Sequence, residues 1–194
     1  MKILITGSEG QLGEVLKSTK PINNDYLFCS KKFLDITNSA NCKDVIGEFK
    51  PDWIINCAAY TKVDNAEDDP DTAFLINSYG PKLICEEIIK YGGRLLHISS
   101  DFVFNGKNNV PYKCGHKVDP LSVYGKSKAE GEKNILNFPN NIIVRTSWLY
   151  GDKGNNFLKT ILRLNDVFLN KEECLKAVSY THLTLPTRRY VGVS

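Results

Sequence analysis

The stretch "KILITGSEGQLG", residues 2–13, decides the fold class, because an apolar run of strand length leads directly into Gly7, Gly10 and Gly13. Glycines between a strand and a helix let the backbone turn sharply, approach a pyrophosphate and pack the helix against the strand. The spacing is G-x-x-G-x-x-G, which differs from the commoner G-x-G-x-x-G, and a glycine-rich turn can be purely structural. At this place we favour a dinucleotide-binding turn, with phosphate at the helix N-terminus.

Working outward from this turn, apolar runs of strand length alternate with segments of helical period along most of the chain. The run at 53–59 is apolar on both faces, as expected when helices cover both sides of a parallel sheet. We therefore predict an α/β, doubly wound parallel sheet, the Rossmann fold. The predicted strands are "KILITG" (2–7), "DYLFCS" (25–30), "DWIINCAA" (52–59), "RLLHISS" (94–100) and "NIIVRTSW" (141–148), and the predicted helices lie at 11–18, 40–49, 71–92, from Ser122 onward and at 155–165.

The bulk composition excludes several classes of protein. The chain has 194 residues, 42% of them hydrophobic and 24% charged, and its net charge of +3 comes from interspersed charges without a basic stripe. We expect no nucleic-acid partner and no membrane partner, because no apolar run approaches the roughly 18 residues of a membrane span. Six cysteines without a C-x-x-C pair and three histidines without ligand-like spacing predict reduced thiols, a cytoplasmic protein and no metal site.

Candidate catalytic residues follow the strand at 94–100. In "LSVYGKSKAE", residues 121–130, Tyr124 and Lys128 are four residues apart and share one face of a helix. Chance supplies about one such pair in a chain of this composition, so the motif alone is weak. Ser100 ends the preceding strand, and the carboxyl ends of parallel strands form the ligand crevice of such sheets. We therefore expect Ser100, Tyr124 and Lys128 to converge over one crevice.

These segments resemble the extended short-chain dehydrogenase/reductases, and within them the dTDP-4-dehydrorhamnose reductases. The resemblance covers about residues 1–165. It rests on "MKILITGSEGQLG", "LDIT", "PDWIINCAAYTKVDNAEDDPDTAFLINSYGPKLI", "LLHISSDFVFNG", "PLSVYGKSKAEGE" and "IIVRTSWLYG".

The resemblance implies an oxidoreductase that transfers a hydride from NADPH, or from NADH, to the C4 ketone of dTDP-4-dehydro-6-deoxy-L-mannose, giving dTDP-L-rhamnose. Catalysis would fall to Ser100, Tyr124 and Lys128, with Tyr124 as proton donor and Lys128 lowering its pKa. Ser100 would orient the ketone, and Phe102, Val103 and Trp148 are the further substrate contacts that it implies, with plain packing as the alternative.

The resemblance also implies a set of cofactor contacts. Two cations at the end of the second strand, Lys31 and Lys32, would suit a 2′-phosphate, which favours NADPH. A homodimer is expected for the full-length protein. The implied cofactor-binding residues are Gly7, Gly10, Gln11, Leu12, Gly13, Asp35, Ile36, Ala58, Ala59, Tyr60, Tyr124 and Lys128.

The chain departs from this family in its last part. Members continue for roughly another hundred residues that form a sugar-nucleotide lobe, which is largely missing here. We expect residues 1–165 to form the NAD(P)-binding domain and residues 166–194 to be a divergent tail, non-native or disordered, because "AVSYTHLTLPTRRYVGVS" resembles translated sequencing-library adaptor. We expect little or no turnover from the 194-residue chain.

Two other functions stay open at this point. The fold also hosts a non-catalytic NADP-binding protein, the regulatory subunit of methionine adenosyltransferase, and the complete triad disfavours that alternative. The other alternative is a different sugar-nucleotide enzyme, an epimerase or a 4,6-dehydratase. A dehydratase needs further acid and base groups, and "SSDFVFNG" offers Asp101 without a neighbouring Glu.

Overall fold

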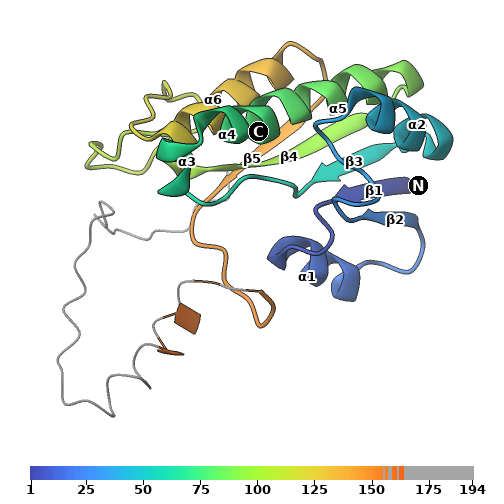
Figure 1. The fold of residues 1–194 in the computed structure, drawn as a ribbon, viewed down its shortest axis with the longest axis horizontal. Helices are drawn as coiled ribbons and strands as arrows, with labels where there is room; N and C mark the ends of the chain where they lie inside the picture. The colour runs from blue at the N-terminus through green and yellow to red at the C-terminus, as the bar shows by residue number, and fades with distance from the viewer. Residues whose placement is uncertain (155, 157–158, 161, 164–194) are drawn as a thin grey trace.

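A parallel sheet forms the centre of the molecule. The computed structural model describes residues 1–154, 156, 159, 160, 162 and 163, and within them five parallel strands pair in the order β2-β1-β3-β4-β5 (Figure 1). The order reverses between β1 and β3, where such sheets bind ligands. The predicted α/β Rossmann fold is confirmed. The strands are β1 (Lys2–Thr6), β2 (Asp25–Cys29), β3 (Trp53–Asn56), β4 (Arg94–Ser100) and β5 (Ile142–Thr146).

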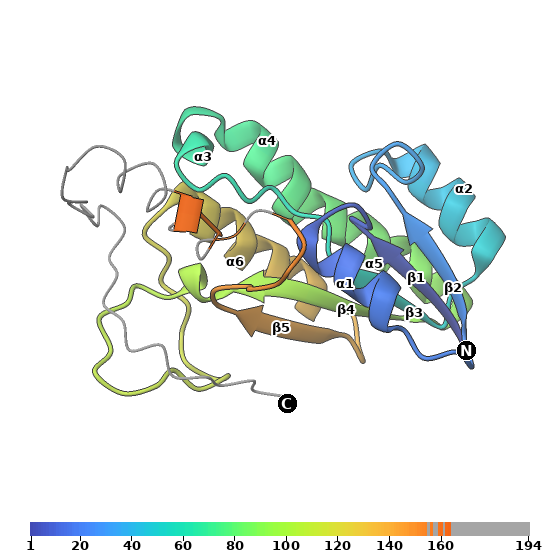
Figure 2. The same cartoon turned by 90° about the horizontal axis from the view of Figure 1, so that it is seen from below.

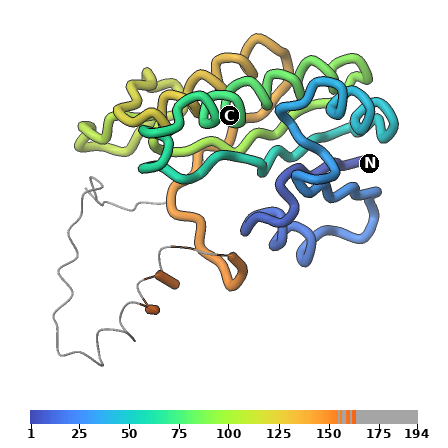
Figure 3. The backbone as a smooth tube through the Cα atoms, in the orientation of Figure 1, coloured from blue at the N-terminus to red at the C-terminus, as the bar shows by residue number. Residues whose placement is uncertain are grey.

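Helices lie on both faces of the sheet. In Figures 1 and 2, α2 (Ser39–Phe49), α5 (Gly80–Ile88) and α6 (Val123–Leu136) cover one face, and α1 (Gln11–Thr19) covers the other. Figure 3 shows the long connection between β4 and α6 projecting from the body. No helix of the described part is long and apolar enough to cross a membrane. Most of the helix predicted at 155–165 and the whole tail at 166–194 lie outside the described residues.

The segment predicted as one or two helices over 71–92 forms a continuous series of short helical elements. Its elements are α4 (Pro70–Phe74), a π-helical turn η1 (Leu75–Tyr79), α5, and a 3₁₀ turn η2 (Ile89–Tyr91), and α3 (Asn65–Asp68) precedes them. The π-helical turn has a local cause. Pro81 has no N–H to donate to the carbonyl of Asn77, so the α-helical pattern cannot continue there.

Two rows of side chains cross the middle strands on the face covered by α5 and α6. Leu4, Ile54 and Leu95 pair in register and form what we call the apolar row, which belongs to the main hydrophobic core. Two residues later, on the same face, Thr6, Asn56 and His97 pair in register as the polar row. All six side chains are at most 1% exposed. The core of the sheet therefore changes from apolar to polar toward the carboxyl ends of its strands.

Candidate cofactor and active site

The glycine turn between β1 and α1 lies against the start of the loop after β3. Gly7 has a φ of +62°, and a Cβ on it would lie 2.7 Å from the nitrogen of Ala58. A Cβ on Gly13 would lie 2.5 Å from the carbonyl oxygen of Gly7. Side chains at these two positions would force the turn, the helix and the loop apart, as the sequence predicts for a backbone built to approach a pyrophosphate.

The remaining residues of the predicted turn lie at the start of α1. Gly10 precedes the helix without a side-chain cap, and Gln11 and Leu12 are its first two residues. The amide nitrogen of Gln11 donates to the carbonyl of Leu149 over 3.0 Å, which ties the turn to the segment after β5. Because Gly10 supplies no capping side chain, the backbone N–H groups at the helix N-terminus could bind an anion.

Asp35 and Ile36 lie beyond β2, and the structure gives them different environments. The Asp35 carboxylate accepts from the nitrogen and the hydroxyl of Thr37, at 3.0 and 2.7 Å. Desolvation by itself would raise the pKa of Asp35, but these hydrogen bonds and the charge of Lys31 lower it below its ordinary value. The Ile36 side chain is buried in the main core, so any contact with a cofactor would fall to its backbone.

Ala58, Ala59 and Tyr60 form the loop after β3, and a residue not singled out from the sequence fixes that loop. Asn77, on η1, accepts from the nitrogen of Tyr60 at 2.9 Å and donates to its carbonyl at 3.0 Å. Its amide also donates to the hydroxyl of Ser127 on α6, at 3.0 Å. The one signal for Asn77 in the sequence is a polar residue inside an apolar helical segment.

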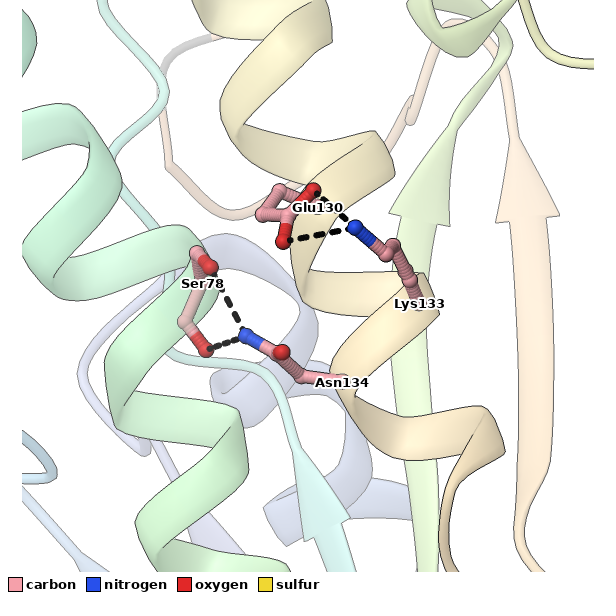
Figure 4. A network of polar contacts seen from close by, with 4 residues as sticks. All are labelled: Ser78, Glu130, Lys133 and Asn134. Atoms are coloured by element: carbon pink, nitrogen blue, oxygen red, sulfur yellow. Dashed lines mark hydrogen bonds and ion pairs between the residues drawn. The ribbon is translucent and has the colours of Figure 1, made fainter.

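Helix α6 is held close to η1 along its length. A Cβ on Gly131 would collide with the carbonyl of Asn77, so the two backbones approach closely only because residue 131 is glycine. The amide of Asn134 donates to the hydroxyl of Ser78 at 3.0 Å, while the Glu130–Lys133 pair of Figure 4 lies toward solvent on the same helix. The predicted start of the helix at Ser122 is confirmed, since its hydroxyl accepts from the nitrogen of Gly125.

Ser100 and Tyr124 come together at the carboxyl end of β4. Both side chains are buried, and the Ser100 hydroxyl donates to Oδ1 of Asp101 over 3.1 Å and accepts from the nitrogen of Phe102 at 3.2 Å. Burial raises the pKa of Tyr124, the neighbouring Ser100 hydroxyl lowers it, and the charge of Asp101 raises it, with a net upward shift. The direction is opposite to the depression expected from Lys128, because desolvation of the phenolate is the largest contribution.

Lys128 is on the same helix face as Tyr124, but its ammonium nitrogen is turned toward β4. Nζ donates to the carbonyl oxygen of Ile98 over 2.6 Å and lies 3.3 Å from Nε2 of His97. Burial lowers the pKa of Lys128 to about 8, and the charge of Glu132 acts in the opposite direction. The structure therefore brings the three predicted catalytic residues to one end of the sheet, with Lys128 bonded beneath the other two.

The predicted substrate contacts divide into exposed and buried side chains. Phe102 is 38% exposed and packs edge-on against the ring of Tyr124, with centroids 5.5 Å apart. Val103 is fully buried, which fits the packing role and leaves its side chain without access to a ligand. Trp148, at a φ of +52°, stacks on Tyr150. Phe102 and Trp148 are thus the side chains in this set that a ligand could reach.

Comparisons with known proteins agree with this geometry. A family model described as the RmlD substrate binding domain matches residues 1–189. The dTDP-4-dehydrorhamnose reductase of Aggregatibacter actinomycetemcomitans is 46% identical over 166 residues, which are 84% of this chain and 56% of that protein. The spore coat polysaccharide biosynthesis protein SpsK of Bacillus subtilis (strain 168) is 40% identical over 165 residues, which are 84% of this chain and 58% of that protein.

Solved structures lead to the same family. The dTDP-4-dehydrorhamnose reductase of Bacillus anthracis str. Ames, in complex with NADP, superposes with a TM-score of 0.83 at 42% identity, covering 86% of this chain and 60% of that one. The chain thus spans somewhat more than half the length of the relatives it matches. The resemblance noted in the sequence is confirmed, and the chain belongs to the RmlD substrate binding domain family.

Proposed function

We propose that this chain supplies the cofactor-binding part and the catalytic residues of a dTDP-4-dehydrorhamnose reductase. The reaction is reduction of the C4 ketone of dTDP-4-dehydro-6-deoxy-L-mannose to dTDP-L-rhamnose, with NADPH as the reductant. The observation that carries the proposal is the meeting of the buried Ser100 and Tyr124 side chains at the carboxyl end of β4. Reductases of this name among its relatives, at up to 46% identity, support the assignment of the substrate.

The residues of the chain fit a dinucleotide. The close approach of Gly7 to the Ala58 backbone and of Gly13 to the carbonyl of Gly7 leaves a turn without side-chain bulk, as a pyrophosphate requires. Gly10, Gln11 and Leu12 would bind the phosphates, and Asp35 and the Ile36 backbone the adenosine end. Ala58, Ala59 and Tyr60 would form the wall beneath the cofactor. NADPH, when bound, would supply the hydride.

The protein's own part is to orient the ketone and deliver a proton. Tyr124 is the donor: its raised pKa keeps the phenol protonated at neutral pH, as an acid in a reduction must be. Ser100 would donate to the ketone oxygen and hold it beside the phenol. Lys128 would supply positive charge near the phenolate that remains, and Phe102 and Trp148 would contact the sugar.

Cofactor binding by the 194-residue chain tests the first half of the proposal. Titration with NADPH and NADH, followed by nicotinamide fluorescence, should give saturable binding with tighter binding of NADPH. Lys31 and Lys32 are exposed at the end of β2, where charge-assisted contacts to a 2′-phosphate would form. The double variant Lys31→Ala/Lys32→Ala should weaken NADPH binding by roughly tenfold or more and leave NADH binding unchanged. The matched control is Lys43→Ala, and equal losses for both cofactors would contradict the 2′-phosphate contact.

The catalytic half is tested in a protein that also carries the sugar-nucleotide lobe. There, Tyr124→Phe should lower the reductase rate by about 10²–10⁴, because the proton donor is lost while the ring remains. Product analysis with the dTDP-4-keto sugar distinguishes reduction from epimerisation or dehydration. Full reductase rate in Tyr124→Phe would refute the assignment.

The proposal extends to location and assembly. We propose a cytoplasmic enzyme, which the five free cysteines of the described residues support, because such thiols persist in a reducing compartment. A homodimer of the full-length protein is supported by family resemblance, and light scattering coupled to size exclusion tests it.

A further inference from the structure

A buried hydrogen-bond chain runs along the polar row from β1 to α6. The hydroxyl of Thr6 donates to Oδ1 of Asn56 over 2.6 Å, and Nδ2 of Asn56 lies 3.0 Å from Nδ1 of His97. On the other side of the imidazole, Nε2 lies 3.3 Å from Nζ of Lys128. Each of the four side chains is at most 2% exposed, so they can satisfy one another but not exchange partners with solvent.

A backbone group fixes the direction of this chain. The N–H of Ala58 is shared between Oδ1 of Asn56 at 3.2 Å and Oγ1 of Thr6 at 3.3 Å, and a backbone N–H can only donate. If the Asn56 amide were reversed, its NH₂ group would face the Ala58 N–H, and the hydroxyl of Thr6 would lose its acceptor. The amide oxygen therefore faces Thr6 and Ala58, and the amide NH₂ donates to Nδ1 of His97.

The tautomer of His97 follows from that direction. Burial is the main cause that lowers the pKa of His97 well below its ordinary value, so the imidazole is neutral and carries one proton. Since Nδ1 accepts from Asn56, the proton is on Nε2, which points at Lys128. An ammonium has donors only, whereas a neutral amine has a lone pair that can accept this N–H. Nζ can still donate to the carbonyl of Ile98 in either form.

We propose that Asn56 and His97 are positioning residues that hold Lys128 against β4 and favour its neutral amine form, in which the Nε2–H of His97 donates to Nζ. The inference rests on the proposed function, in which Lys128 is the cation of the site. Protonation of Nζ would break this hydrogen bond, so the polar row lowers the pKa of Lys128 while the ammonium is still populated at neutral pH. The two middle strands of the sheet would thereby control when the site becomes charged.

The protonation of Lys128 also depends on the charged groups around it. On its own helix, Glu132 favours the ammonium, but that carboxylate forms a 2.6 Å ion pair with Arg145 of β5, which neutralises much of its field. Burial raises the pKa of Asp101, which follows β4, so this carboxyl group is less readily charged. Tyr124 is neutral at ordinary pH. Burial outweighs these contributions, since the pKa of Lys128 falls to about 8.

Nuclear magnetic resonance of the 194-residue chain without added cofactor tests the proposal directly. Ring-nitrogen shifts of ¹⁵N-labelled histidine report the tautomer, and the ¹³Cε shift of labelled lysine, assigned with Lys128→Met, reports the titration of Lys128. We expect the Nε2–H tautomer and a Lys128 midpoint near pH 8, well below the reference of about 10.4 for a lysine in water. A proton on Nδ1, or a Lys128 that titrates with the exposed lysines, would overturn the proposal.

Two variants separate positioning from packing. His97→Gln offers an amide oxygen to Lys128, so the Lys128 midpoint should rise by about one pH unit or more, a tenfold change in proton affinity. Ser99→Ala, a buried change on the same strand, should leave the Lys128 midpoint unchanged. An unchanged midpoint in His97→Gln, or an equal shift in Ser99→Ala, would count against the proposal.

The measurement on the unmodified chain decides the matter if His97→Gln does not fold. None of these NMR measurements uses cofactor or substrate. Failure of the chain to bind NADPH would therefore refute the proposed function without affecting the tautomer and titration results.

Discussion

The apolar row and the polar row occupy the same strands, the same face and the same depth of the molecule, yet they serve different ends. Leu4, Ile54 and Leu95 contact side chains of the surrounding helices and contribute through the burial of apolar surface. Thr6, Asn56 and His97, two residues further along, contact one another through hydrogen bonds. A shift of two residues toward the carboxyl ends thus separates a row that packs against the helices from a row that reaches Nζ of Lys128.

The largest expected effect lies in the apolar row. Ile54→Ala should lower the free energy of unfolding by about 2–5 kcal/mol, because a fully buried side chain leaves a cavity among close neighbours. Urea denaturation measures the loss, and the Lys128 titration should stay unchanged if the rows are independent. The control is Ile22→Ala, at a position 97% exposed, which should change stability by less than about 0.5 kcal/mol. Equal losses of stability in Ile54→Ala and Ile22→Ala would contradict the stabilising role of the apolar row.

Next comes the pH dependence imposed by Lys128. Its pKa is about 8 in the folded chain against an ordinary 10.5, so between these values the unfolded chain binds more protons and the stability of the folded chain rises with pH. Lys128→Met removes this penalty, and we expect it to be more stable at pH 7 by on the order of 3 kcal/mol. The difference should narrow from pH 8 to pH 10.5.

Buried thiols act in the opposite direction but cancel in this difference. Burial raises the pKa of Cys29, Cys42, Cys57 and Cys85 to about 12, so each loses its contribution to stability as pH rises above about 9. The unmodified chain and the Lys128→Met variant both carry these thiols, so their contribution cancels in the difference in stability. Urea denaturation at pH 7, 8, 9 and 10 should therefore isolate the contribution of Lys128, with Lys126→Met, at an exposed position of the same helix, as the matched control. A stability difference between Lys128→Met and the unmodified chain that stays constant with pH would contradict the expectation.

A smaller loss is expected when the polar row is made apolar. Asn56→Leu keeps the approximate volume but leaves the Thr6 hydroxyl and Nδ1 of His97 without their partners, at a cost of about 1–3 kcal/mol. The same variant should release the His97 tautomer, which ¹⁵N shifts would record. Asn65→Leu, at an exposed position, is the matched control. A stability equal to that of the unmodified chain would mean that the polar row contributes no directed bonding.

The smallest effect separates a bonded hydroxyl from an unbonded one. Ser99 has a buried hydroxyl that makes no hydrogen bond within the described residues, so Ser99→Ala should change stability by no more than about 0.5 kcal/mol. Thr6→Val removes a hydroxyl that donates over 2.6 Å and should cost about 1 kcal/mol. Thermal unfolding at one pH compares the two, and equal values would remove the distinction between them.

Much of the architecture was predictable from the sequence, because it follows from local pattern. The alternation of strands and helices, the glycine turn and the helix start at Ser122 all depend on neighbouring residues. The meeting of Ser100 and Tyr124 followed from the rule that ligands gather at carboxyl ends.

What the sequence did not predict depends on register between distant segments. Asn56 and His97 are 41 residues apart and meet through strand pairing, which no local pattern encodes. Asn77 acts through a π-helical turn, and the position of Nζ of Lys128 depends on which buried acceptors surround it. No spacing in the sequence singles out His97, because a lone histidine in a strand carries no sign of its partners.

The in-register polar row also has a consequence for how the chain finds its fold. A slip of β3 by one residue would place Ile55 or Cys57 between Thr6 and His97, and would leave several buried polar groups without partners at once. Apolar neighbours such as Ile54 and Ile55 discriminate poorly between such alignments, whereas the polar row permits one. The side chains of the polar row would thus also favour the correct strand register during folding, because misaligned strands would leave buried polar groups unpaired.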